Sequence, residues 1–141
     1  MIKICKEFKW EMGHRLMYHN GLCVNPHGHS YKMQVILEGK KDNNGMVMDY
    51  FELEQIVNEV INDFDHSFVV NEKDFVMRDF LVKNNFKYVT LPFDATAENL
   101  CDVFCDLLSN KLKLINNLKM LAIRIYETQD VYAERGIVLN Y

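Results

Sequence analysis

The thirteen residues HNGLCVNPHGHSY, from His19 to Tyr31, contain three of the five histidines and one of the four cysteines in the chain. His27 and His29 are two residues apart, so their side chains point to the same face if this segment is a β-strand. Two imidazoles placed in this way can bind one metal ion. Three histidines with an open fourth position are typical of a catalytic zinc site.

His14 is the candidate third ligand. It has the same parity as the apolar residues of the alternating segment 2–14, and we expect this segment to pair with the strand that carries His27 and His29. The alternative is that the His-Gly-His triplet is a chance pair of surface histidines.

Cys23 lies four residues before His27, in a loop rich in glycine, asparagine and proline. As a fourth zinc ligand it would close the site and make the metal structural. As a thiolate near the cation it would instead act as a base or a nucleophile. The spacing alone leaves both roles open. Cys101 and Cys105 are also spaced for a metal, but they lie beside the apolar stripe of a predicted helix, and we interpret them as buried helix residues.

Two further places carry polar side chains that could do chemistry. Asp65 is next to His66, and a carboxylate can orient an imidazole and tune its basicity, although a histidine at a helix C-terminus is also simply favoured by the dipole. Glu127 shares the parity of apolar strand residues, where a carboxylate is costly to bury without donors. Either the strand has ended there, or Glu127 binds a ligand with paired N–H donors, such as guanine or a pterin.

The elements that must position these residues follow from periodicity. Alternation predicts strands over 2–14, 27–39, 121–127 and 131–139, the last two joined by the turn Thr-Gln-Asp. Apolar spacing of three and four predicts amphipathic helices after the N-caps Asp49 and Thr96. Residues 67–95 are the least regular and indicate a short helix over 74–84 and a short strand over 87–91.

Four strands in two hairpins with two helices predict a single α+β domain over residues 1–141. The sheet would leave two open edges, which favours an oligomer that continues it. The net charge of −4 argues against a nucleic-acid partner. We find no signal peptide and no run of about 20 apolar residues, so we expect a cytoplasmic protein with reduced cysteines and no membrane partner.

Several motifs together resemble the 6-pyruvoyltetrahydropterin synthase family, which includes the 6-carboxytetrahydropterin synthases of queuosine (7-deazaguanine) biosynthesis. The resemblance spans nearly the whole chain and rests on motifs in the family's order: G-H-R-L (13–16), C-x-x-x-H-G-H-S-Y (23–31), G-M-V-M-D-Y-F-E-L (45–53), F-D-H-S-F (64–68), T-A-E-N-L (96–100) and Y-E-T (126–128). It implies the tunnelling fold (T-fold), an antiparallel four-stranded sheet with helices on one face. Trimers would close into a β-barrel and stack as a homohexamer.

The resemblance also implies a role for each candidate residue. His14, His27 and His29 would bind Zn²⁺, and Cys23 would be the catalytic thiol. Asp65 and His66 would form a proton-relay pair that reaches Cys23 across a subunit boundary. Glu127 would hold the pterin ring, with Thr96 and Glu98 near it. The triphosphate ligands are not implied; Arg15, Lys32 and Arg135 are candidates.

The implied reaction is the zinc-dependent conversion of 7,8-dihydroneopterin triphosphate, a lyase reaction without an external redox cofactor. Members that make the pyruvoyl product usually have five residues between the cysteine and His-Gly-His, whereas 6-carboxy synthases have three. Here Val24, Asn25 and Pro26 make three. The resemblance therefore favours 6-carboxy-5,6,7,8-tetrahydropterin, acetaldehyde and triphosphate as products. A 6-pyruvoyltetrahydropterin synthase and a non-catalytic zinc-binding module remain as alternatives.

Overall fold

The computed structural model describes residues 1–141, and its two longest strands form a hairpin. β1 (Ile2–His14) and β2 (His27–Gly39) run antiparallel along their whole length. Their alternate residues are buried, as expected for a sheet with one face on the core. The pairing register places His14 directly opposite His27, and Met12 opposite His29. The connection between the strands carries a 3-10 turn, η1 (Leu22–Val24), which contains Cys23.

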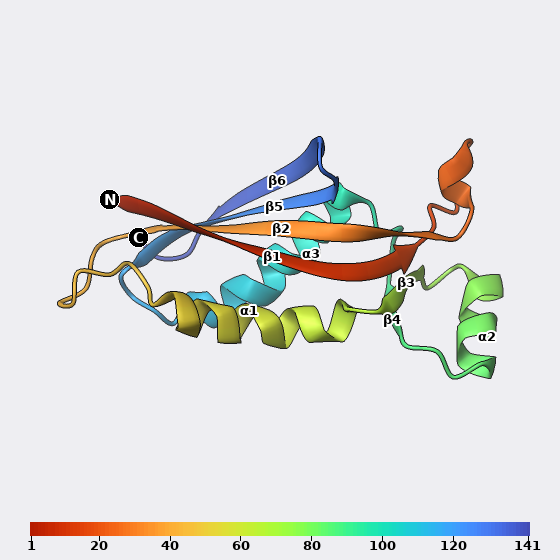
Figure 1. Ribbon diagram of the computed structural model, residues 1–141, viewed down its shortest axis with the longest axis horizontal. Coiled ribbons are helices and arrows are strands. Elements are labelled where there is room, and N and C mark those ends of the chain that lie inside the picture. Colours follow the sequence, from red (N-terminus) through yellow and green to blue (C-terminus); the bar gives the residue numbers. More distant parts are fainter.

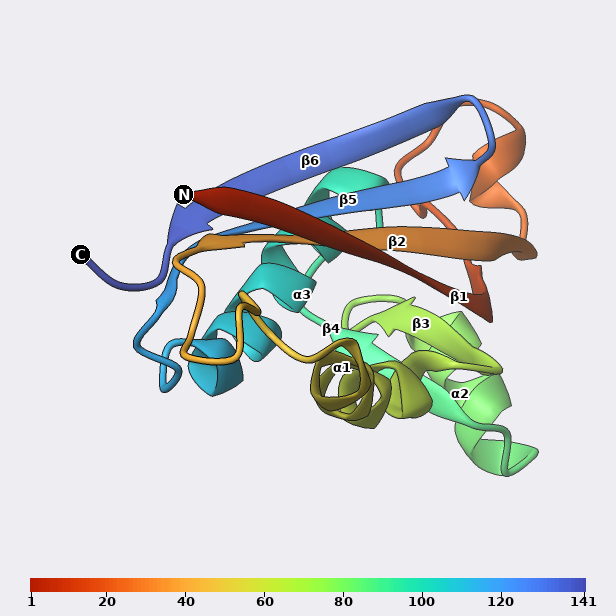
Figure 2. The ribbon, with the colours of Figure 1, turned by 60° about the vertical axis from the view of Figure 1, so that its left-hand side comes forward.

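Two further strands extend the sheet on the β2 side. β5 (Leu118–Thr128) pairs with β2, and β6 (Val131–Val138) pairs with β5, both antiparallel. The long helices α1 (Tyr50–Phe64) and α3 (Ala97–Leu112) cover one face of the sheet (Figures 1 and 2). Both begin at the predicted N-caps, because the side chains of Asp49 and Thr96 accept backbone N–H groups of the first turn. The predicted α+β class and T-fold are confirmed.

The sheet has six strands instead of four, because the short strand expected over 87–91 and one unexpected strand both join it. It is mixed instead of purely antiparallel. β3 (Ser67–Asn71) runs parallel to the end of β1, and β4 (Tyr88–Leu91) runs parallel to β3. The strand order is β4-β3-β1-β2-β5-β6. β3 was missed because Ser67, Val69, Val70 and Asn71 are all buried, so the strand shows no alternation. The expected short helix is α2 (Phe75–Lys83), which lies between the two added strands.

The core lies between the sheet and the two long helices. Trp10 of β1 stacks on Tyr31 of β2 at 5.4 Å between ring centroids, and its ring also meets Phe104 of α3 at 5.3 Å. Phe64 at the end of α1 packs on the same phenylalanine at 4.9 Å. This aromatic cluster fixes the end of α1 and the middle of α3 against the hairpin, close to the His14–His27 pair. No helix is both long enough and apolar enough to span a membrane.

Candidate active site

The three histidines of the predicted metal site meet at the end of the β1–β2 hairpin. Their candidate ligand nitrogens all lie within 4.8 Å of one another, and the Nε2 atoms of His14 and His27 are 3.1 Å apart. Nitrogen ligands about 2.0–2.1 Å from a tetrahedral zinc ion are separated by roughly 3.3 Å. The hairpin register therefore produces a cluster of the size that one metal ion requires.

Backbone carbonyls fix the tautomers of two of these rings. The Nδ1–H of His14 donates to the carbonyl of Ala95 at 2.7 Å, and the Nδ1–H of His27 donates to that of Asn25 at 2.7 Å. A carbonyl only accepts, so in the neutral rings both Nε2 atoms carry lone pairs. Two lone pairs at 3.1 Å cannot form a hydrogen bond with each other. A shared cation satisfies both, and outer carbonyls of this kind are typical of metal-binding histidines.

The surroundings keep the cluster neutral. Burial lowers the pKa of His14 to about 4, and burial together with His27 lowers the pKa of His29. Neutral imidazole is the form that binds a metal. Sequence reasoning missed Tyr31, whose buried hydroxyl lies 3.4 Å from Nδ1 of His14 and whose ring meets that of His29 edge-on. Its parity with His27 and His29 was the signal that places it beside them.

Cys23 lies on the loop that closes the hairpin, and its position is set by the backbone. The N–H of Leu16 donates to the carbonyl of Cys23 at 2.8 Å, so the residue two beyond His14 holds the thiol loop. The side chain is a partly exposed free thiol. Cys101 and Cys105 are buried in α3, as predicted, and burial raises their thiol pKa values to about 11 and about 12. Of the three, only Cys23 lies in the hairpin that carries the histidines.

Asp65 and His66 bond to each other although they are adjacent. His66 has a positive φ of 57°, which turns its ring back so that Nδ1 lies 2.9 Å from Oδ1 of Asp65. The same oxygen accepts the backbone N–H of Glu11 at 3.0 Å, and this bond, with His66, lowers the pKa of the Asp65 carboxyl. The N–H of His66 donates back to the carbonyl of Glu11. The pair is thereby attached to β1, with Nε2 of His66 directed away from Asp65.

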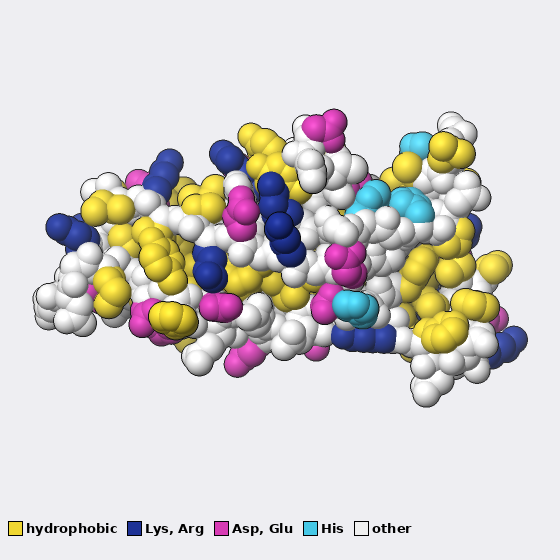
Figure 3. Space-filling view, in the orientation of Figure 1, with side chains coloured by type: hydrophobic (Ala, Val, Ile, Leu, Met, Phe, Trp, Pro, Cys, Tyr) yellow, Lys and Arg dark blue, Asp and Glu magenta, His cyan; other side chains and the backbone are white.

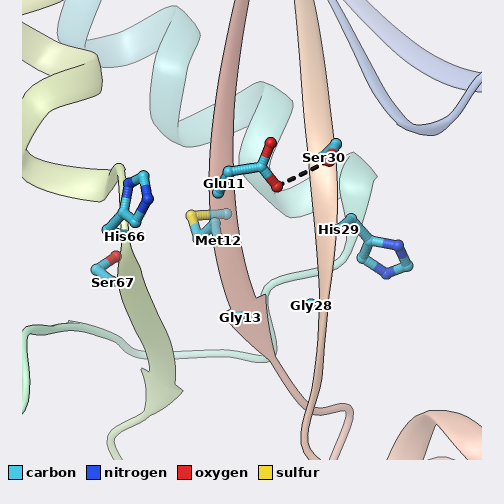
Figure 4. Close-up of a pocket in the computed structure, with 8 residues that line it drawn as sticks. All are labelled: Glu11, Met12, Gly13, Gly28, His29, Ser30, His66 and Ser67. Carbon is cyan, nitrogen blue, oxygen red and sulfur yellow. Dashed lines mark hydrogen bonds between the residues drawn. The ribbon is translucent and has the colours of Figure 1, made fainter.

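His66 and His29 line one hollow of about 370 Å³ (Figure 4). The two side chains come from opposite sides of β1, and the carboxylate of Glu11, which accepts the hydroxyl of Ser30, lies between them. Figure 3 shows histidine and acidic side chains reaching the surface at this end of the molecule. Cys23 does not line this hollow. One chain therefore does not enclose Cys23 and His66 in a common pocket.

Glu127 lies at the end of β5 and faces the histidine cluster. Its Oε2 is 4.0 Å from Nε2 of His29, and burial, followed by the charge of Glu98, raises the pKa of its carboxyl. Thr96, Glu98 and Glu127 line one hollow at the start of α3, so the structure brings the three predicted pterin-binding residues together. A carboxylate with few donors of its own is suited to a ligand that brings paired N–H groups.

Glu127 also lines another hollow, of about 750 Å³, together with His29 and Lys32. Of the three triphosphate candidates, only Lys32 lines it. Arg15 is instead bound to Asp74, and Arg135 to Asp102 on α3. The hollow is large enough for a small heterocyclic ligand.

The curled sheet, the two helices on one face and the hairpin-end histidine cluster define a T-fold protein with a candidate metal-dependent active site. The sequence model described as 6-pyruvoyl tetrahydropterin synthase matches residues 3–136. The chain belongs to the 6-pyruvoyl tetrahydropterin synthase family.

Two relatives named as synthases are similar to the chain in sequence, and a solved structure is similar to it in fold. The chain is 38% identical over 142 residues to a 6-carboxy-5,6,7,8-tetrahydropterin synthase of Haemophilus influenzae, an alignment that covers 95% of this chain and 98% of the relative. It is 30% identical to the Aquifex aeolicus protein of the same name, over 94% and 96% of the two chains. The crystal structure of a 6-pyruvoyl tetrahydropterin synthase from Plasmodium vivax superposes with a TM-score of 0.79 at 17% identity, over 97% and 98% of the chains.

Proposed function

We propose that this protein is a zinc-dependent lyase that converts 7,8-dihydroneopterin triphosphate and water into 6-carboxy-5,6,7,8-tetrahydropterin, acetaldehyde and triphosphate. The observation that carries the proposal is the hairpin-end cluster of His14, His27 and His29, with Cys23 in the loop that connects the two strands. Relatives that are 38% and 30% identical to this chain carry the name of this synthase. The three-residue spacing between Cys23 and His27 also favours the 6-carboxy product.

The three histidines would hold Zn²⁺, which as a Lewis acid would lower the pKa of the hydroxyls on the substrate side chain. Glu127 would accept the paired N–H groups of the pterin ring, with Thr96 and Glu98 beside it. Two hollows lined by Glu127 support this orientation, because one contains Glu98 and the other contains His29. The ring would then point its side chain toward the histidine cluster.

Cys23 would remove and return protons on the substrate side chain as a thiolate. His66 would carry protons through Nε2, because Asp65 occupies its Nδ1. The side chain would lose triphosphate by elimination and break one carbon–carbon bond to release acetaldehyde. The ring gains the hydrogens that the side chain loses, so no external redox cofactor is required.

The site would be completed between subunits of a homohexamer. Within one chain, His66 is 75% exposed and does not share a hollow with Cys23. β6 and the first ten residues of β1 have an unpaired edge, which subunits could use to continue the sheet. We also propose that the protein acts in the cytoplasm, where its four free cysteines would stay reduced.

Incubation with 7,8-dihydroneopterin triphosphate, trapping of acetaldehyde and mass spectrometry of the pterin test the proposal. We expect trapped acetaldehyde and the 6-carboxy product. A pyruvoyl product without acetaldehyde would identify a 6-pyruvoyltetrahydropterin synthase instead. An unconsumed substrate with zinc fully bound would favour a non-catalytic zinc module.

A further inference from the structure

The segment from Glu72 to Lys87, here called the edge insertion, contacts both parts of the proposed catalytic machinery without supplying a residue to either. It carries α2 and connects β3 to β4 at one edge of the sheet (Figure 1). Its first turn lies against the end of β1, and its last residue lies under the end of α1.

At its beginning, the insertion holds the loop that carries Cys23. Asp74 is 3% exposed and accepts both Nη2, at 2.9 Å, and Nε of Arg15. A two-point pair of this kind fixes the plane of the guanidinium. Nη1 of Arg15 points back to the carbonyl of Val24, and the N–H of Leu16 donates to that of Cys23. The carboxylate of Asp74 is therefore connected to the thiol loop through one side chain.

At its end, the insertion holds the Asp65–His66 turn. Nζ of Lys87 donates to the carbonyl of Asn62 at 2.6 Å and to that of Asp65 at 2.7 Å. These carbonyls belong to the C-terminal end of α1, which has no basic residue in its own last turn. A cation there binds carbonyls that the helix leaves without partners.

The His66 backbone needs such support, because a positive φ is uncommon for a residue with a side chain and is retained only when its surroundings hold it. The carbonyl that Lys87 binds is that of Asp65, directly before this strained residue. The carbonyl of Lys87 also accepts the N–H of Phe68. The side chain and the backbone of this lysine therefore bind the residues before and after the turn.

We propose that Asp74 and Lys87 are positioning residues for the reaction, with Asp74 ordering the Cys23 loop through Arg15 and Lys87 ordering the Asp65–His66 turn. The inference rests on the proposed function for its kinetic consequence. Neither side chain touches the reacting atoms. Misplacement of a catalytic group by about 1 Å lowers turnover by roughly 100-fold, while leaving substrate contacts in place.

Lys87→Met and Lys87→Arg test the second half of the proposal. In the zinc-loaded oligomer, we expect Lys87→Met to lower kcat by about 10- to 100-fold, with KM changed less than about threefold. Lys87→Arg restores donors to both carbonyls and should recover most of kcat. Lys83→Met removes an exposed lysine from the same insertion and should behave as the wild type.

Asp74→Asn tests the first half, because asparagine keeps the N-cap oxygen of α2 but loses the charge that binds Arg15. We expect kcat to fall, and iodoacetamide to alkylate Cys23 faster, as resolved by peptide mass spectrometry. Asp49→Asn makes the same change at the N-cap of α1, which has no arginine partner, and should change neither quantity.

Measurements without substrate separate this inference from the proposed function. Amide hydrogen exchange of the peptide that contains His66 should be faster in Lys87→Met than in Lys83→Met. If wild-type protein consumes no substrate, the proposed function fails, while the exchange and alkylation rates still decide the positioning roles. The inference would be overturned if Lys87→Met kept the kcat and exchange rate of the wild type and Asp74→Asn kept its kcat and alkylation rate. It would also be overturned if the two control variants showed equal losses.

Discussion

Asp65 and His66 show how much one backbone angle decides at the scale of the residue. Adjacent side chains in a regular strand point to opposite faces and do not meet. The φ of 57° at His66 brings Nδ1 to within 2.9 Å of the Asp65 carboxylate. The bond leaves Nε2 free, and this is the atom that we expect to exchange protons.

Cys23→Ala separates catalysis from metal binding at this scale. If the thiol is a base and not a ligand, the variant should keep its zinc and its oligomeric state and lose turnover by at least about 100-fold. Zinc content by elemental analysis and kcat for dihydroneopterin triphosphate are the two measurements. Loss of zinc together with the thiol would show a closed, structural site instead.

Glu127→Gln tests the pterin contact. The substitution replaces one acceptor oxygen with an N–H donor, which would face the donors of the ring, so we expect binding to weaken by roughly 2–5 kcal/mol. Calorimetric titration with a pterin that cannot react measures the change, and zinc content checks the fold. Glu38→Gln, at the far end of β2, is the matched control and should bind normally. Unchanged affinity in Glu127→Gln would make Glu127 only a strand-end residue.

At the scale of the element, α3 both packs against the sheet and forms one wall of the candidate site. Six of its residues are buried, whereas its start places Thr96 and Glu98 in the hollow beside Glu127. Thr96 is the N-cap, since its hydroxyl accepts the N–H of Asn99 at 3.1 Å. The start of the helix and the wall of the hollow therefore depend on the same residue.

Thr96→Ala should lower the free energy of unfolding by about 1 kcal/mol, because one N-terminal N–H loses its partner. Thr96→Ser keeps the hydroxyl and should remain within a few tenths of a kcal/mol of the wild type. Urea unfolding of the zinc-loaded protein at one fixed protein concentration measures both. Equal midpoints for all three proteins would contradict the capping role.

At the scale of the whole molecule, the proposed machinery is divided. Cys23 lies in the hairpin loop, and His66 lies across β1 at the end of α1. If subunits complete each other's sites, Cys23→Ala and His66→Ala should each be inactive alone but complement each other in mixed oligomers. Random mixing in equal amounts would restore both groups in about a quarter of the sites. Co-expression and a kcat assay test this, and no recovery in verified mixed oligomers would place the relay within one chain.

The sequence by itself determined the hairpin, the two long helices and the residues gathered around them. Alternation through residues 2–14 and 27–39 is a local signal, and it fixes the face on which His14, His27 and His29 lie. The N-caps of both helices are equally local. A period of two or of about 3.6 can be read from one sequence, because the direction of a side chain in a strand or a helix follows from its position along that element.

Contacts between segments that are distant in the sequence follow no period, and only the tertiary structure decided them. β3 is buried on both faces and has no alternation, so its parallel pairing with β1 depends on residues more than fifty positions away. His14 likewise binds the carbonyl of Ala95, and Arg15 binds Asp74, each more than fifty positions away. Lys87 reaches the carbonyl of Asp65, 22 positions before it. These contacts join segments that are distant in the chain, and their energies come from groups that meet only after the sheet has formed. The sequence therefore identifies the candidate catalytic and metal-binding residues, and the tertiary structure determines which contacts position them.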